Sequence, residues 1–334
     1  MQKRVNIKAI VSAVLFTVLT ILFPVSCSIR EGLDPCPRGL DLRFVFDYNM
    51  EYANAFPSKV DCYTLYIYDG QGKFLKSYSE MGDKLRDENY RLQVDLPLGK
   101  YQLVALGGTT CDKHSFSVVK NPENGGTRSD LQVKMQQKGM TSDQLLHDYF
   151  YGALDVEVGN DGFTYTPATI KMMRNTNNIR VLLQHLDGTA VPMDKFKFSI
   201  EDDNTLFDAD NKLIPNGKVS YLPWAMGVTK PSRANDESEV SAGYAEFSTS
   251  RLWAENNNRL IVRRVEDDGV VMNIPLNEYL LMLKSERYNQ MGGQEFLDRE
   301  NDWSMIFFLD SRYKWINTQI IVNGWVVRLN EAEL

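Results

Sequence analysis

Cys27 is the residue whose type and position carry the clearest chemistry in this 334-residue chain. Three basic residues lie within the first eight positions, and the run over 9–26 carries no charge. A basic start, an apolar stretch and a small residue at the boundary are typical of an export signal. A cut between Ser26 and Cys27 would expose the cysteine for acylation, as in bacterial lipoproteins. We therefore predict a signal peptide over 1–26 and a lipid on Cys27.

A second interpretation of the same segment remains open. Eighteen uncharged residues are close to the minimum length of a membrane-spanning helix, so 9–26 could also be an uncleaved anchor. Pro24 argues against a continuous helix up to the boundary. Pro24 also stands where lipoprotein signals usually carry leucine. No other segment is long and apolar enough to span a bilayer.

Other residue types that commonly carry chemistry do not form a recognisable site. The three histidines, His114, His147 and His185, are scattered, and no Cys/His spacing suits zinc. Phosphate-binding loops, the nucleophile elbow and the metalloprotease helix motif are all missing. We expect no catalytic residue, no metal and no cofactor, and we do not expect an enzyme.

Acidic clusters and tryptophans are the weaker candidates. The clusters lie at 201–203, 208–210 and 266–268. Each could supply half of a carboxylate pair for glycoside hydrolysis, but acidic residues more often stabilise turns. Exposed tryptophans could bind sugar, although in sheet proteins they more often belong to the core. The five are Trp224, Trp253, Trp303, Trp315 and Trp325.

The net charge limits the expected binding partners, and the cysteine count limits the possible disulfides. Removing 1–26 changes the formal net charge from −7 to −10, so nucleic acid is not an expected partner. Besides Cys27, the chain holds Cys36, Cys62 and Cys111. An exported protein can form a disulfide, but three cysteines allow one intramolecular bridge at most, and the pair stays undecided.

The elements that must position these residues read mostly as strands. Alternating or β-branched runs occupy 42–47, 62–68, 90–96 and 101–106, and Asp69-Gly70 predicts a hairpin turn. Further strands are predicted over the second half of the chain, at 168–173, 179–185, 196–200, 245–249, 260–265, 270–274, 303–309, 316–322 and 325–329. Helical spacing predicts one helix over 276–289, and one or two helical turns could occupy 142–148.

Many short strands separated by turns are typical of β-sandwiches. The chain is long enough for two domains. We predict an all-β protein with minor helix, divided into an N-terminal β-sandwich over 27–163 and a C-terminal β-sandwich over 164–334.

Several segments together resemble the FimB-type fimbrial anchor lipoproteins of Bacteroidales. Their order and spacing carry the resemblance across nearly the whole mature chain. The segments are Asp34-Pro35-Cys36-Pro37, FVFDYN at 44–49, LYIYDGQGKFL at 65–75, Leu96-Pro97-Leu98-Gly99, Phe150-Tyr151-Gly152, FLDREND at 296–302 and IVNGWVV at 321–327.

This resemblance implies two tandem transthyretin-like β-sandwiches and a non-enzymatic role at the base of a pilus. The protein would sit on the outer membrane at the cell surface through the lipid on Cys27. It would accept a strand from the first fimbrial stalk subunit, because such subunits join by strand exchange, in which main-chain hydrogen bonds supply affinity. Any open groove must be covered by a partner or by the chain's own strand. A pilus tip or accessory subunit and a surface glycan-binding lipoprotein are the alternatives.

Overall fold

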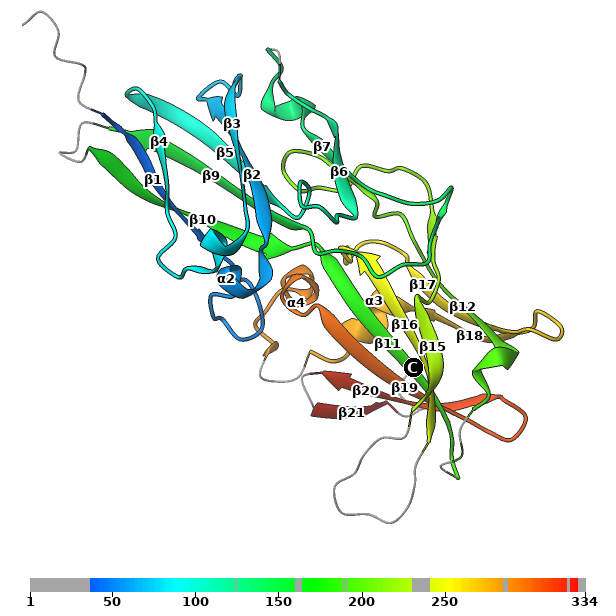
Figure 1. Ribbon diagram of the computed structural model, residues 1–334. Coiled ribbons are helices and arrows are strands. Elements are labelled where there is room, and N and C mark those ends of the chain that lie inside the picture. The colour runs from blue at the N-terminus through cyan, green and yellow to red at the C-terminus, as the bar shows by residue number, and fades with distance from the viewer. Residues whose placement is uncertain are drawn as a thin grey trace, which may run out of the picture.

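The computed structural model describes residues 37–123, 125–159, 164–187, 189, 191–229, 241–284, 288–322 and 325–329. Within these residues the chain is built almost entirely of strands, with only a few short helices (Figure 1). The strands form two β-sandwiches and a small third sheet. The predicted all-β class is confirmed.

The first sandwich is a seven-stranded sheet that folds onto itself. Its order is β3-β2-β5-β9-β10-β1-β4. In β10, residues 165–171 pair with β1 and residues 172–174 pair with β9, so the sheet bends across this strand. The bounds are β1 Gly39–Val45, β2 Cys62–Asp69, β3 Phe74–Met81, β4 Leu92–Asp95, β5 Gly99–Gly107, β9 Phe150–Val158 and β10 Tyr165–Arg174.

Strand β2 is buried on both faces. Leu65 and Ile67 belong to the core of the first sandwich, whereas Tyr66 and Tyr68 belong to a second core on the opposite face. The sequence of a strand that is buried on both faces is a continuous apolar run and does not alternate between apolar and polar residues. The covering layer on the outer face is the three-stranded sheet, formed by β6 Phe116–Lys120, β7 Gln132–Met135 and β13 Leu206–Phe207.

The second sandwich encloses the larger core between a six-stranded and a five-stranded sheet. The six-stranded sheet has the order β15 Ala225–Thr229, β16 Ala242–Ser250, β11 Thr176–His185, β19 Asp302–Leu309, β20 Trp315–Val322 and β21 Trp325–Leu329. The five-stranded sheet has the order β18 Val270–Pro275, β17 Arg259–Arg264, β12 Phe196–Asp202, β14 Val219–Tyr221 and β8 Thr141–Ser142.

The helices differ from the expectation. The α-helices are α2 Phe56–Lys59, α3 Leu276–Leu281 and α4 Gly293–Arg299, and the 3-10 turns are η1 Asp83–Arg86, η2 Arg128–Asp130 and η3 Met193–Lys195. The helix predicted over 276–289 therefore ends at Leu281, where the Leu283 amide donates to the Leu280 carbonyl in a tighter turn. The helical turns suggested for 142–148 are wrong, because Ser142 pairs with Tyr221 as a strand.

Strand β10 of the first sandwich leads into β11 of the second through Asn175 alone, although β8 already pairs with β14 of the second sandwich earlier in the chain. Strand β10 ends at Arg174 and β11 begins at Thr176. Strand β10 lies beyond the predicted division at 163/164, yet it pairs with β1 and β9 of the first sandwich. We propose Asn175 as the boundary between the domains.

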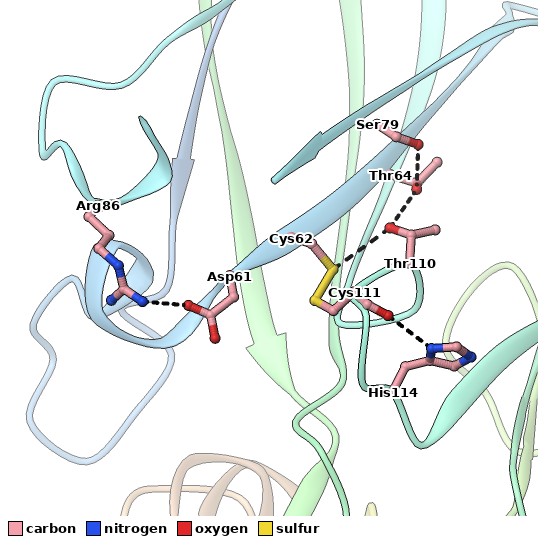
Figure 2. The surroundings of a disulfide bond; sticks show 8 residues. All are labelled: Asp61, Cys62, Thr64, Ser79, Arg86, Thr110, Cys111 and His114. Carbon is pink, nitrogen blue, oxygen red and sulfur yellow. Dashed lines mark hydrogen bonds and ion pairs between the residues drawn. A yellow bond between two sulfur atoms is a disulfide. The ribbon is translucent and has the colours of Figure 1, made fainter. Parts of the chain in front are cut away.

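Cys62 and Cys111 form a disulfide (Figure 2). This identifies the pair of cysteines that the sequence left undecided. It ties the start of β2 to the loop after β5, across a sequence separation of 49 residues. The Thr110 hydroxyl donates to Cys62 Sγ, and the Gly108 amide donates to the Cys62 carbonyl at 3.0 Å. Cys27 and Cys36 lie outside the described residues. The bridge fixes the loop 108–115 onto the first sandwich.

Buried polar side chains connect the second sandwich to Asn175 at the junction and to the loop after β13. Arg251 and Asp298 form a two-point ion pair at 2.7 Å, and Arg251 Nη1 donates to the Asn211 carbonyl at 2.8 Å. The Asn211 and Asn175 side chains bond to each other in both directions. Every one of these groups is almost inaccessible to water, so each needs the partners it has.

Candidate functional site

Strand β1 is an internal strand of the first sandwich, with a neighbouring strand on each side. It pairs with β10 in parallel and with β4 in antiparallel orientation. Leu40 and Leu42 are fully buried and Phe44 is 3% exposed. A side chain at Gly39 would collide with the Val94 carbonyl, so the strand also needs glycine where it enters. Strand β1 is therefore a fully paired element with its apolar face in the core of the first sandwich.

The segment after β1 is held against the second sandwich. The Arg299 guanidinium on α4 lies 4.1 Å from the ring centre of Tyr48 and 4.6 Å from that of Tyr52. Its Nη1 donates to the Asn49 carbonyl at 3.3 Å. Cations over aromatic rings add stability beyond packing. The position of β1 is thus coupled to the second sandwich through Arg299.

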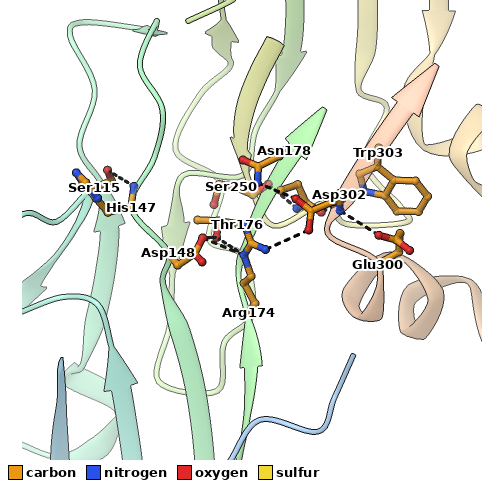
Figure 3. Close-up of polar contacts among 11 residues, drawn as sticks. Ser115, His147, Asp148, Arg174, Thr176, Asn178, Ser250, Glu300, Asp302 and Trp303 are labelled. Atoms are coloured by element: carbon orange, nitrogen blue, oxygen red, sulfur yellow. Dashed lines mark hydrogen bonds and ion pairs between the residues drawn. The ribbon is translucent and has the colours of Figure 1, made fainter. Parts of the chain in front are cut away.

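A cavity of about 740 Å³ lies at the junction of the sandwiches. The disulfide lines one part of it, and Asp148, Arg174 and Asp302 line another. Figure 3 shows Arg174 pointing toward both carboxylates. Its Nε donates to Asp148 Oδ1 at 2.9 Å, and Nη1 lies 3.6 Å from Asp302 Oδ2. Thr176 also donates to Asp148. One arginine of β10 is thus shared by two carboxylates, and its contact with Asp302 at the start of β19 links the first sandwich to the second.

A neighbouring hollow of about 460 Å³ brings an exposed tryptophan next to polar side chains. Trp224 is 39% exposed, and Arg180, Glu246 and Asn178 line the same hollow. Arg180 Nε donates to Glu246 Oε1 at 2.8 Å, and Asn178 Nδ2 donates to Asp302 Oδ1 at 2.8 Å. An indole beside paired donors and acceptors is a surface that can contact a polar ligand with an apolar face.

The other tryptophans have different surroundings. Trp303 is 2% exposed and belongs to the core. Trp253 lies under the Arg251 guanidinium at 4.6 Å, and Trp315 packs against the core with partial exposure. The Trp325 side chain is outside the described part of the structure. Of the tryptophan side chains described, Trp224 alone is exposed enough to serve as a binding surface.

The acidic clusters act in turns and in packing. Asp208 and Asp267 accept backbone amides of the residues two positions later. Asp202 is 4% exposed and accepts hydrogen bonds from Asn256 and Asn258. Burial raises the pKa of Asp202 to about 6, against the lowering effect of those bonds. No two of the clusters form a carboxylate pair across a cleft in the described residues.

Metal and membrane features can be assessed only for the described part of the chain. Within it, no group of three or more histidine, cysteine or acidic residues could hold a metal ion. None of its helices combines the length and apolar character needed to cross a membrane. The predicted lipid site, Cys27, lies outside the described residues and stays a prediction.

A family model described as fimbrillin-A associated anchor proteins Mfa1 and Mfa2 matches residues 33–331. A candidate adhesin from Bacteroides thetaiotaomicron is 47% identical, with a TM-score of 0.83 over 90% of this chain and 100% of that one. A candidate polysaccharide-binding protein from the same organism is 29% identical, with a TM-score of 0.76 over 90% and 100%. The fimbrial anchor protein Mfa2 from Porphyromonas gingivalis shares the fold at 16% identity, with a TM-score of 0.66 over 88% and 99%. No curated protein matches the chain.

Proposed function

The chain belongs to the family of fimbrillin-A associated anchor proteins, and from this premise we propose that it is a non-enzymatic anchor subunit at the base of a pilus. A lipid on Cys27 would hold it in the outer membrane at the cell surface. The first stalk subunit would join it by β-strand complementation. The observation that carries the proposal is that β1, shortly after Cys27, is an integral strand of the first sandwich.

The position of β1 suits attachment to a membrane. The strand begins at the end of the first sandwich that points away from the second (Figure 1). A lipid on Cys27 would therefore place the first sandwich next to the membrane and the second sandwich away from it. Acyl chains bury about 0.8 kcal/mol per CH₂ group, and two chains hold a protein stably. The second sandwich would remain accessible to a stalk subunit.

Cleavage after an arginine would distinguish a stalk or tip subunit from an anchor. An arginine-directed cut in the first domain would discard the lipid and indicate a stalk or tip role. Between Arg43 and Arg86 the chain has no arginine. A cut at Arg43 would divide β1, and a cut at Arg86 would remove β1, β2 and β3 together. Arg30 and Arg38, however, lie between Cys27 and β1. A cut at either would discard the lipid and leave β1 whole, so the N-terminal mass, and not the arginine spacing, decides between the roles.

The experiment is the mass of the N-terminal peptide purified from native membranes, combined with a Cys27→Ala variant. We expect an acylated peptide that begins at Cys27, and we expect the variant to shed its pili into the medium. Cys36→Ala is the matched control and should keep both the lipid and the pili. An N-terminus well downstream of Cys27, after an arginine, would contradict the anchor role and favour a tip or accessory subunit.

A second candidate function is glycan binding, because Trp224 is exposed beside Arg180, Glu246 and Asn178. Aromatic faces with neighbouring polar groups suit sugars. Binding of the purified protein to a glycan array tests it, with Trp224→Ala as the variant. Leu75→Ala is the control, because Leu75 is 45% exposed on β3 of the first sandwich. If Trp224→Ala still binds glycan as Leu75→Ala does, or if the unchanged protein binds no glycan, the surface beside Trp224 is not a glycan site.

A further inference from the structure

Strand β15 carries an apolar row that faces the core side of its sheet. In the antiparallel pair with β16, Met226 lies opposite Ala245 and Val228 opposite Gly243. Directly paired residues project to the same face of a sheet. Ala245 is fully buried in the core, and a side chain at Gly243 would collide with Met193. Met226 and Val228 therefore point toward the space between the two sheets.

This row is nevertheless open to solvent. Met226 is 42% exposed and Val228 is 55% exposed. The chain crosses from the five-stranded to the six-stranded sheet at this edge, between β14 and β15. There the five-stranded sheet ends in strands of three and two residues, β14 and β8. These short strands leave the core side of β15 without a full covering layer among the described residues.

The opposite face of β15 is covered by the protein itself. A side chain at Gly227 would come within 2.9 Å of the Tyr244 hydroxyl, which lies across the strand on that side. β15 is also an end strand of the sheet, so one side of its backbone has no neighbouring strand in the described structure. What remains open is the hydrogen-bonding edge together with the core-side row of Met226 and Val228.

Edges of this kind are normally protected against unwanted pairing by charges, prolines or bulges. Strand β3 carries Lys76 and Glu80 at its edge, and Arg259 covers β18 by donating to the Asn273 carbonyl at 2.8 Å. The run 219–229, which includes β15, has no charged residue at all. An unprotected, uncharged edge beside an open core row indicates a docking surface.

We propose that the edge of β15 receives an extended strand of the first stalk subunit; this rests on the proposed anchor function. The free backbone edge selects a strand as occupant, because only an extended main chain can continue the ladder. The occupant is uncharged over about five residues, the length of β15, since a charge would be buried without a partner. Its alternate side chains are apolar and enter beside Met226 and Val228.

The first test places a photo-crosslinking amino acid at position 228 in cells that carry pili. Mass spectrometry then identifies the crosslinked peptide. We expect a peptide from the stalk subunit with apolar residues at alternate positions. The same crosslinker at position 75, on the edge of β3, should not reach that peptide. A crosslink from position 228 to residues 230–240 of the same chain, to a second copy, or to nothing would overturn the proposal.

The second test measures binding of the purified stalk subunit, as identified by the crosslink, to Val228→Lys. We expect affinity to fall about tenfold or more, because the lysine blocks the edge and cannot be buried. Val270→Lys is the matched control: Val270 is 49% exposed on the β18 edge, and its affinity should change less than about twofold, since the site lies elsewhere. Equal denaturation midpoints would show that both variants fold.

The outcomes separate this proposal from the anchor function. Suppose Cys27→Ala sheds the pili, while Val228→Lys binds the stalk subunit as tightly as the unchanged protein. The docking edge would then be wrong and the anchor function would stand. If Cys27→Ala keeps its pili attached, the anchor function fails whatever Val228→Lys does.

Discussion

Buried polar side chains govern the behaviour of this protein at the scale of single residues. Arg251, Asp298, Asn211 and Asn175 are all nearly inaccessible to water and bond to one another across the junction. Asp202 is buried nearby in the second sandwich with only amide partners. Such groups contribute little net stability while intact, but removing one partner leaves the other desolvated and unpaired.

Asp202 should give the protein a pH dependence of a defined sign. Burial raises its pKa from 3.8 to about 6, so the folded protein binds this proton more tightly than the unfolded chain. Its contribution to stability is fully present below pH 3.8 and is lost as the pH rises through about 6. We expect up to about 3 kcal/mol of unfolding free energy to disappear from this group over that window.

The measurement is urea denaturation of the unchanged protein and of Asp202→Asn at pH 4, 5, 6 and 7. The difference between their pH profiles isolates Asp202, because every other titrating group is common to both. The unchanged protein should lose more stability than the variant as the pH rises. Parallel profiles would show that Asp202 titrates normally.

The Arg251–Asp298 pair should be costly to break from one side. Arg251→Met leaves the Asp298 carboxylate buried, with the Gln294 amide still donating to it. We expect a loss of about 3–5 kcal/mol in unfolding free energy, as for other broken buried pairs. The double variant Arg251→Met with Asp298→Leu should recover much of that loss. If the double variant loses as much unfolding free energy as the two single variants together, the broken ion pair does not explain the loss in Arg251→Met.

At the scale of elements, β1 is the strand on which the first sandwich depends. It has neighbours on both sides and a buried face formed by Leu40, Leu42 and Phe44. Its exposed face carries Arg43. The segment that follows it is held by Arg299. A strand integrated in this way should behave as permanent structure and should not exchange for a partner strand.

Leu42→Ala tests this integration. Leu42 is fully buried, and truncation of a buried leucine to alanine costs about 2–5 kcal/mol. Arg43→Ala on the exposed face of the same strand should change stability by less than about 0.5 kcal/mol. Denaturation in urea measures both. If the two variants were equally stable, β1 would not be part of the cooperative core.

Local signals predicted most of these strands, and long-range pairing explains what they missed. Asp69-Gly70 and Asp267-Asp268-Gly269 do lie between paired strands, because such turns are set by neighbouring residues. The parallel pairing of β1 with β10 joins distant segments and has no local signal. The two-residue strands β8 and β13 pair with residues far along the chain, which is why 142–148 was misread.

The domain boundary and the binding surfaces also depend on which distant strands pair, and local sequence does not show this. The predicted division at 163/164 separates β9 from β10, yet these two strands pair within the first sandwich. Trp224 could not be told from the buried Trp303, because exposure depends on which strands cover a residue. The open edge of β15 follows from the shortness of β14 and β8, which only the assembled fold reveals.

At the scale of the whole molecule, the larger apolar core extends from the second sandwich onto the outer face of β2 and β5 in the first. It joins Tyr66 and Val104 of the first sandwich, through Phe116 and Phe207, to the interior of the second. The disulfide and the Arg174 cluster lie along the same junction. A shared core of this kind couples the stabilities of two domains, so the sandwiches should unfold together.

The tryptophans provide a simple measure of that coupling, because all five follow Asn175 and therefore report on the second sandwich. In Leu42→Ala the mutated residue belongs to the first sandwich. We expect the fluorescence midpoint in urea to fall together with the circular dichroism midpoint. A variant whose fluorescence transition stays in place while the circular dichroism shifts would show independent domains.

The parallel arrangement of β1 and β10 has a mechanical consequence. Strand β1 starts at the pole far from the second sandwich, and β10 runs alongside it and continues through Asn175 into β11 (Figure 1). A pull on the N-terminus, opposed by a load on the second sandwich, drags β1 lengthwise against its neighbours. All hydrogen bonds of both ladders then resist at once, whereas a sideways pull would open them one after another. The geometry suits a protein that carries tension between a membrane and a filament exposed to flow.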